Sequence, residues 1–414
     1  MKNIKNKLSI ATCTLLTGGL QQAQAIENSW DLDSSFLYYR EDDDRVTVNK
    51  AIAILSGDLS DTDSVTVNLV LDTMSGSTPT GAVYSKVSSV NTFSSASGAS
   101  SNTSAGESVD IAKFNDARLS ISLDWAHSLD RLKTIKYGGS LSVEKDYQSY
   151  GASVTLNQDS EDRIITYTAG LAASYDQIYT KNGGTPGPLS NIEDNITFGD
   201  GERYTYDGIL GISKVINRTT VAQINYTMGY STGYHTDPYK AISLVRLVAD
   251  SDSNSFVLRE VERYFESRPE TRQRNAIFTS LAHQYGERDD IIHLSYRYYW
   301  DDWDVTGHTI DFTHRRLLQN ERYIEPHIRL HTQTAANFFM HSILDDGSPL
   351  PDFASADYRL DTTTGVTLGI EYGRPLSGGK LRARLERIDW QYDHAEYNET
   401  QATVFQISYQ KLFD

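Results

Sequence analysis

Arginine and aspartate gather in one part of the second half of the chain, where they could make strong polar contacts. A short run holds Arg268, Arg272 and Arg274, and Asp301 and Asp302 follow it. An arginine side chain can bind a carboxylate or a phosphate through two parallel hydrogen bonds. The run therefore predicts either a salt-bridged hinge or a mouth that binds anions.

Further charged residues alternate with apolar ones along extended stretches. Because side chains in a β-strand point to opposite faces at every second position, such charges would share one face of a sheet. Facing rows of arginine and carboxylate inside a barrel would either set the selectivity of an aqueous pore or close the lumen. These residues are Arg297, Asp311, Arg315, Glu325, Arg329, Arg382, Arg384 and Glu386.

Histidine offers metal chemistry, since most of the ten histidines lie between His283 and His341. His327 and His331 share a strand face, but residues four apart on a strand are about 13 Å apart. Zn–N bonds are only about 2.0–2.1 Å long, so a partner on another strand, such as His293 or His308, would be needed. We expect polar filling of a lumen, with no metal site and no cofactor.

An outer-membrane hydrolase is the least favoured class of function. Ser295, His308 and Asp311 supply a nucleophile, a base and an acid, but they could meet only across strands. The chain has no Gly-x-Ser-x-Gly elbow, no phosphate-binding loop and no dinucleotide fingerprint. We therefore predict no catalytic residue.

The elements that must position these side chains are about sixteen stretches in which apolar and polar residues alternate. Most are longer than the roughly 9–11 residues with which a tilted strand crosses a bilayer. A count of fourteen or eighteen strands stays open. The predicted strands are 30–40, 46–57, 64–74, 115–127, 133–145, 148–157, 162–175, 204–214, 218–230, 271–285, 289–300, 306–318, 322–334, 358–373, 379–392 and 400–413.

The long gaps between these strands all fall at odd-numbered junctions, namely 75–114, 176–203, 231–270 and 335–357. In an up-and-down meander all odd junctions lie on one side, and short turns on one side with long loops on the other are typical of bacterial outer-membrane barrels. The sequence predicts an all-β fold: a transmembrane, antiparallel, up-and-down barrel with long extracellular loops. Two β-rich stretches, 242–249 and 256–265, predict a hairpin above the membrane.

This topology brings three strand ends to one rim. The start of 271–285, the end of 289–300 and the start of 306–318 would be neighbours about 4.8 Å apart. We therefore expect one polar cluster near the outer mouth, with Tyr239 and Lys240 close by. Its members would be Arg268, Arg272, Arg274, Arg297, Asp301, Asp302 and His308.

Tryptophan marks both rims of the predicted barrel. Trp30 and Trp125 fall at the short-turn rim, while Trp300 and Trp390 fall at the long-loop rim. Aromatic side chains form girdles at both interfaces of outer-membrane barrels. The last strand also alternates up to Phe413, which would suit recognition by the barrel assembly machinery.

Composition narrows the class of protein. The net charge is −17 and mean hydropathy is −0.46. An acidic chain argues against nucleic acid as a partner. Helical membrane proteins are far more hydrophobic, whereas only alternate residues of a barrel strand face lipid.

The first 25 residues predict a secretory signal peptide. Basic Lys2, Lys5 and Lys7 precede a short apolar stretch, and Ala23-Gln24-Ala25 is a small-x-small cleavage site. Cleavage would leave 26–414 as one barrel domain, and it would remove Cys13, the single cysteine.

Motifs in the second half resemble a family of bacterial outer-membrane barrel proteins known as a domain of unknown function. They are Asp237-Pro238-Tyr239-Lys240, the 266–274 run, and Tyr296 to Trp303 followed by His308-Thr309. The resemblance implies a barrel and supplies no activity.

Three functions stay open. We expect a porin-like channel for small hydrophilic solutes, or else a closed binding or scaffold barrel for a periplasmic or surface partner, with a hydrolase third. The expected surroundings are outer-membrane lipid and lipopolysaccharide.

Overall fold

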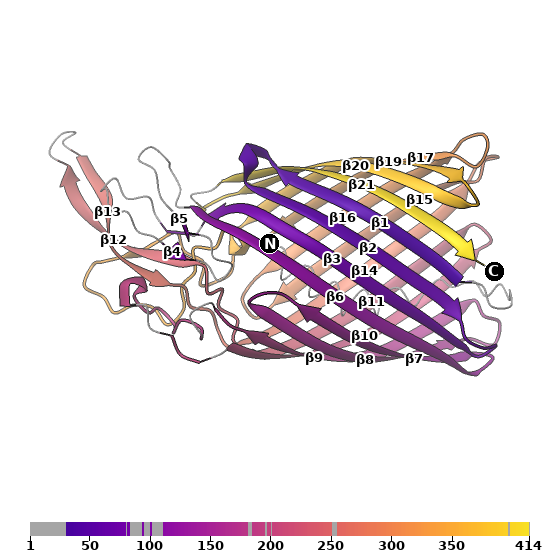
Figure 1. Ribbon diagram of the computed structural model, residues 1–414, viewed down its shortest axis with the longest axis horizontal. Helices are drawn as coiled ribbons and strands as arrows, with labels where there is room; N and C mark the ends of the chain where they lie inside the picture. Colours follow the sequence, from indigo (N-terminus) through magenta and orange to yellow (C-terminus); the bar gives the residue numbers. More distant parts are fainter. Residues whose placement is uncertain are drawn as a thin grey trace.

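Sixteen antiparallel strands close into one barrel, in which neighbours in the chain are neighbours in the sheet and β1 pairs with β21 (Figure 1). The computed structural model describes residues 30–79, 81–82, 93–94, 100–101, 111–180, 184–194, 197–199, 201–250, 255–395 and 398–413. The predicted signal peptide lies outside these residues. Among them, no helix is long and apolar enough to cross a membrane.

The wall strands are long and are joined by tight turns at one end of the barrel. Their bounds are β1 (Trp30–Glu41), β2 (Val46–Asp58), β3 (Asp63–Pro79), β6 (Ile111–Asp130), β7 (Lys133–Val143), β8 (Tyr147–Asp159), β9 (Ile165–Ile178), β10 (Gly201–Asn217), β11 (Thr220–Gly233), β14 (Thr271–Tyr285), β15 (Asp290–Asp301), β16 (Thr306–Leu317), β17 (Tyr323–Gln333), β19 (Thr363–Leu376), β20 (Gly379–Tyr392) and β21 (Glu399–Phe413).

The predicted fold class, strand count and junction parity are confirmed. Most strand bounds differ from the predicted ones by a few residues, and two differences change the connections. The strand expected from residue 358 begins at Thr363, because η4 (Tyr358–Leu360) is a 3-10 turn capped by the side chain of Asp357. β3 and β6 remain paired as far as Pro79 and Ile111, so the first long loop is shorter than expected.

The alternation of each wall strand separates an apolar outer face from a polar inner face. Leu171, Leu210 and Leu368 stay exposed on the outer face, as lipid-facing residues must. The inner face includes His327 of β17, which bonds Asp311 on the neighbouring strand β16 and Glu386 on β20, the strand beyond β19.

Trp30, Trp125 and Trp300 lie on the outer face, where Trp300 stacks 5.2 Å from Tyr298. The girdle prediction is wrong for Trp390. That ring packs edge-on against His331 at 5.4 Å and covers Gly365, where an added Cβ would meet it at 2.8 Å. The reason is parity, because Trp390 shares its face of β20 with Glu386, which points into the lumen.

The long connections after β11 and β17 fold over one end of the barrel, and we call the described parts of 234–270 and 334–362 the cap. The predicted hairpin is present as β12 (Ala241–Asp250) and β13 (Ser255–Phe265), and β18 (Ile343–Leu344) pairs with β12. It projects beyond the wall (Figure 1). The remaining short elements are β4 (Phe93–Ser94), β5 (Ser100–Ser101), η2 (Asp42–Asp44) and η3 (Ile192–Asp194).

The cap has apolar cores of its own. One cluster contains Ile242, Ile343, Ala354 and Ala356. A second joins Phe338 and Leu360 of the cap to Trp303 in the β15–β16 turn, with Val305 and Ala336. These cores hold the cap against the rim, so it is a folded part of the structure.

Candidate functional site

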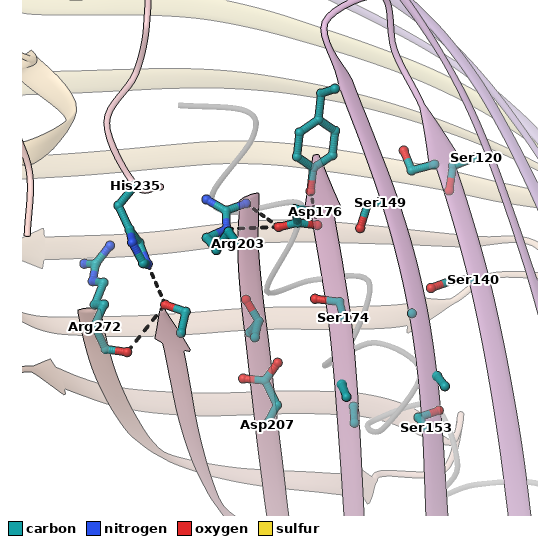
Figure 2. A pocket seen from close by; sticks show the side chains of 18 of the residues that line it. Ser120, Ser140, Ser149, Ser153, Ser174, Asp176, Arg203, Asp207, His235 and Arg272 are labelled. Atoms are coloured by element: carbon teal, nitrogen blue, oxygen red, sulfur yellow. Dashed lines mark hydrogen bonds and ion pairs between the residues drawn. The ribbon is translucent and has the colours of Figure 1, made fainter. Parts of the chain in front are cut away.

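A cavity of about 110 Å³ lies inside the capped end of the barrel (Figure 2). Strands β6 to β11 and β14 supply its walls, and His235 and Arg268 reach it from the cap. One wall carries hydroxyl groups, the other carries arginines, and both line the same space. The cavity is therefore the place where a solute in the lumen would meet protein side chains.

The hydroxyl-bearing wall consists of small residues at every second position of β7, β8 and β9. Ser140, Ser153 and Ser174 point into the cavity (Figure 2). The glycines opposite them leave room for the hydroxyl groups, because a Cβ on Gly138 would meet the Ser153 Oγ at 2.4 Å and one on Gly151 would meet the Ser140 Oγ at 2.4 Å. We call these three serines and two glycines the serine wall.

The serine wall was not among the predicted site residues. Its signal is the period-two spacing of Gly138, Ser140 and Ser142, then Ser149, Gly151 and Ser153. Small residues on an inner face add no charge and no apolar bulk, so a search for reactive side chains passes over them.

Two arginines of the cavity are neutralised by carboxylates on adjacent strands. Arg203 Nε donates to Asp176 Oδ2 at 3.0 Å, and the Tyr147 hydroxyl donates to the other oxygen of Asp176. Arg118 Nε donates to Asp72 Oδ2 at 3.0 Å. These pairs fix the arginine forks along the wall and leave their charge balanced.

Arg272 and Asp301 meet at the capped rim. The Arg272 Nε lies 2.8 Å from the Asp301 Oδ2, and the guanidinium lies 4.1 Å from the centre of the Trp303 ring. The other Asp301 oxygen accepts from the backbone N–H groups of Trp303 and Val305, both at 3.0 Å. Asp301 therefore ties β14 to the β15–β16 turn. Asp302 is exposed and accepts from the Gln273 N–H at 2.9 Å.

Arg268 belongs to a different group, a buried ionic network in the cap. Arg268 Nε lies 2.5 Å from Glu266 Oε1, and Arg268 Nη2 lies 2.8 Å from Asp357 Oδ2. Arg359 bridges Asp357 and Asp237. We call Asp237, Lys240, Glu266, Arg268, Asp357 and Arg359 the cap network. Tyr239 reaches away from it and donates to Asp146 at 2.7 Å.

Burial and charge act in opposite directions within the cap network. Burial raises the pKa of Glu266, since its charged form loses hydration. Burial also disfavours the ionised form of Asp357, but Arg359, Lys240 and Arg268 outweigh it and hold the pKa of Asp357 well below its usual value. Burial lowers the pKa of Lys240. The network is stable only as a set of opposite charges.

His308 does not join the mouth cluster, and this expectation was wrong. Its Cα partner is Tyr298, its ring lies 5.0 Å from the Tyr298 ring, and it bonds the Tyr296 hydroxyl at 2.7 Å on the outer face. Cross-strand partners share a face, so His308 follows Tyr298 outward. Ser295 and Asp311 are partners on the inner face. The three residues weighed for hydrolysis therefore lie on opposite sides of the wall.

The remaining charged candidates line the lumen below the cavity. His327 bridges Glu386 at 2.8 Å and Asp311 at 3.0 Å. The other pairs are Arg315 with Glu325, Arg329 with Asp311, Arg382 with Asp33, and Arg384 with Glu386. Arg274 lines the cavity itself, and it shares a small recess with Arg297 on the next strand.

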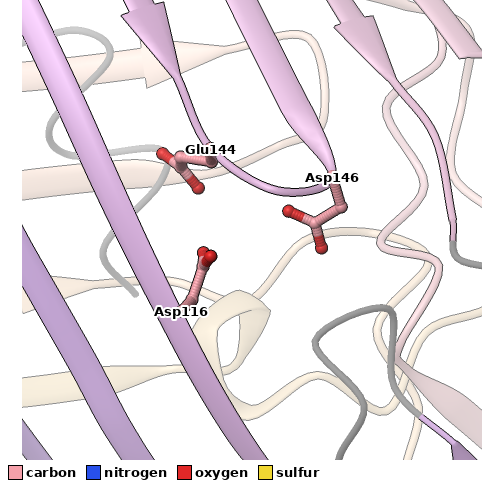
Figure 3. A group of neighbouring side chains, drawn as sticks. All are labelled: Asp116, Glu144 and Asp146. Atoms are coloured by element: carbon pink, nitrogen blue, oxygen red, sulfur yellow. The ribbon is translucent and has the colours of Figure 1, made fainter.

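Asp116, Glu144 and Asp146 form an acidic group at the capped end (Figure 3). Their nearest carboxylate oxygens all lie within 4.8 Å of one another, and hard cations such as Ca²⁺ bind such oxygens. Burial raises the pKa of Asp146, which lies in the β7–β8 turn. The sequence analysis missed this group because β6 and the turn meet only in the folded barrel.

Comparison with known proteins gives the family. The family described as "Protein of unknown function (DUF3570)" matches residues 5–410. The chain belongs to this family. The resemblance drawn from the sequence motifs is thereby confirmed. No curated protein matches the chain.

Solved structures similar to this DUF3570 barrel are outer-membrane barrels of low sequence identity. CdiB from Acinetobacter baumannii has 7% identity and a TM-score of 0.50, covering 94% of this chain and 61% of that one. A ferric enterobactin receptor variant from Pseudomonas aeruginosa has 9% identity and a TM-score of 0.45, covering 90% of this chain and 54% of that one. A bacterial polysaccharide outer-membrane secretin has 10% identity and a TM-score of 0.46, covering 94% and 100%. Likeness at this identity is a likeness of fold.

Proposed function

We propose that this protein is an outer-membrane channel through which small hydrophilic solutes pass. The observation that carries the proposal is the cavity beneath the cap, lined by hydroxyl groups and arginines within a closed barrel of sixteen strands. Barrels of about 16–18 strands have room for an aqueous channel, whereas barrels of about eight are filled by side chains.

The chemistry of the inner face supports a wet lumen. Ser140, Ser153 and Ser174 offer hydroxyl groups that can donate or accept hydrogen bonds without a fixed charge. Some arginine–carboxylate pairs deeper in the lumen keep part of their surface exposed: Arg315 and Glu325 have 39% and 18% of their side chains exposed. Charges that retain water contacts suit a solvated passage.

The cap would act as the outer filter of this channel. It is held in place by its apolar cores and by the cap network, so the route around it has a defined shape. In this orientation the cap is extracellular, and the outer aromatic rings such as Trp300 and Tyr298 lie at the lipid interface near lipopolysaccharide. The barrel assembly machinery would insert the chain after removal of the signal peptide.

Conductance of the purified, refolded protein in planar bilayers tests the proposal. Discrete, voltage-stable steps in potassium chloride are the expected result, and heat-modifiable gel mobility verifies that the barrel is folded. The control is a variant that lacks residues 85–105 of the long connection between β3 and β6. Folded protein that gives no conductance steps, either as wild type or as this variant, would contradict a channel.

A surface-binding barrel is the second candidate, and the hairpin favours it. Leu247, Phe256, Leu258 and Val261 are exposed on β12 and β13, above the wall. Exposed apolar side chains on a projecting element often mark a binding surface. Folded protein without conductance, combined with a cell-surface cross-link that needs Phe256, would support this alternative.

A further inference from the structure

Two neighbouring arginines of the lumen, Arg274 and Arg297, have only one carboxylate partner between them, Asp207. Within the described part of the chain, Arg297 has no carboxylate oxygen within ion-pair distance, and its guanidinium lies 5.6 Å from the centre of the Tyr299 ring. Arg274 reaches Asp207 only at 3.5 Å, and its Nε is buried without a hydrogen-bond partner. Buried donors are rarely left unpaired, because the lost hydration is costly.

These two arginines lie together on the inner face. Arg274 is on β14 and Arg297 is on the adjacent strand β15, and both line a small recess with Asp207 and Tyr299. We call Arg274 and Arg297 the basic step. Arg272 and Arg203 are close enough to act electrostatically on Arg274, and Arg329 acts on Arg297. Their own carboxylates balance these neighbours. The basic step has two guanidinium groups and the single carboxylate of Asp207, so one positive charge is in excess there.

The basic step opens toward the serine wall. Arg274 also lines the main cavity, which contains the serines of β7 to β9. That lining has five arginines and three carboxylates: Arg118, Arg203, Arg268, Arg272, Arg274, Glu144, Asp176 and Asp207. Four of these arginines pair with carboxylates in the lining or just behind it, so the unbalanced positive charge at the cavity is that of the basic step. A solute here meets guanidinium groups on one side and hydroxyl groups on the other.

We infer that the basic step binds small oxyanions, carboxylates or phosphates that also carry hydroxyl groups, and that these are the preferred solutes. The inference rests on the proposed function. An oxyanion would accept hydrogen bonds from the Arg297 fork and from the part of the Arg274 guanidinium that faces the lumen. Hydroxyl groups on the solute would exchange hydrogen bonds with the serine wall. Pores that select anions are commonly lined by a ring of arginine or lysine side chains.

Binding and selectivity of the detergent-purified barrel test this inference together. Phosphate and gluconate are titrated calorimetrically into wild type and into the double variant Arg274→Ala/Arg297→Ala. Loss of two charge-assisted contacts should weaken the binding of the preferred anion at least about tenfold. The anion that binds more tightly to wild type identifies phosphate or carboxylate as the recognised group.

Reversal potentials in a potassium chloride gradient supply the second measurement. Wild type should favour chloride, and the double alanine variant should lose that preference while it still conducts. The variant Arg274→Lys/Arg297→Lys keeps both charges and is the control for misfolding of the alanine variant. It should keep the chloride preference but bind the anion severalfold more weakly, since lysine lacks the planar fork.

Arg387→Ala is the matched control, because Arg387 pairs with Asp42 on the outer face. It should leave affinity and selectivity unchanged. Neither anion binding to wild type, or equal binding to wild type and the double alanine variant, would overturn the inference. A barrel that binds the anion through the basic step but does not conduct would contradict the channel and leave the binding site standing.

Discussion

The cap and the lumen wall both contain arginine–carboxylate ion pairs, but the pairs lie in different surroundings. In the cap network the Glu266, Arg268 and Asp357 residues are only 0%, 4% and 1% exposed. On the wall, Arg315 and Glu325 keep 39% and 18% of their side chains exposed. Buried charges must all be paired, because an unpaired one is costly, whereas wet pairs contribute little. We infer that the buried ion pairs stabilise the folded cap, whereas partly exposed pairs such as Arg315–Glu325 set the electric field of the lumen.

Breaking the cap network should give the largest effect. Arg268→Ala leaves the buried carboxylates of Glu266 and Asp357 short of their shared cation. The free energy of cap unfolding should fall by about 3–5 kcal/mol. Hydrogen exchange of the described cap backbone would rise, and proteases would cut there. Heat-modifiable mobility should persist, since the wall strands are unaffected. Unchanged exchange would show that the apolar cores alone hold the cap.

Acid should unfold the cap within a defined range of pH. Because the pKa of Asp357 is held well below its ordinary value of 3.8, its contribution is complete above that pH and is lost as the pH falls below it. Asp237 acts in the same sense, because Arg359 outweighs the effect of burial and lowers its pKa. Glu266 acts oppositely, since burial raises its pKa above 4.5 and protonation relieves the cost of its charge.

The cap should therefore keep its exchange protection from neutral pH down to about 4 and lose it under stronger acid. Exchange measured as a function of pH, with the wall strands as internal reference, checks this expectation. Loss of protection that begins well above pH 5 would contradict it. Asp357→Asn should remove much of the acid transition.

Arg272→Ala should have an intermediate effect. It removes one partner of Asp301, but that carboxylate keeps the Tyr299 hydroxyl and the N–H groups of Trp303 and Val305. The rim should lose about 1–3 kcal/mol of stability. Limited proteolysis at the β15–β16 turn measures it, with Arg272→Lys as the conservative control. An effect as large as that of Arg268→Ala would remove the distinction between rim and cap.

Arg315→Ala should have the smallest effect. Its pair with Glu325 is partly exposed to the lumen, so the loss of stability should be about 1 kcal/mol or less. Thermal unfolding at low and high salt provides the measurement, and salt should shrink even that difference. A loss comparable to that of Arg272→Ala would mean that wall pairs are structural, contrary to the comparison with the cap.

The barrel followed from sequence because its signals are local and periodic. Alternation gave the strands, and topology alone brought Arg272 to Asp301. His308 and Trp390 were placed at the correct rim but on the wrong face. The alternation of the strand would have given the correct face for His308, because it lies two residues from Ile310, which is exposed on the outer face.

The cap network could not be predicted, because its contacts have no period. Arg268 and Asp357 are 89 residues apart and lie in irregular segments. Only the folded chain brings them together. The serine wall has a period but no charge, so it would be found by counting small inner-face residues rather than reactive ones.

Single-channel conductance of a filled serine wall tests the central claim most directly. Ser140→Trp/Ser153→Trp places two large rings in the cavity, whereas Leu141→Trp/Val154→Trp places them on the lipid-facing side of the same strands. The account predicts discrete conductance in wild type, a severalfold reduction in the serine variant, and wild-type conductance in the outer-face control. Folded wild type without conductance, or equal conductance in the three proteins, would contradict a solute path along the serine wall.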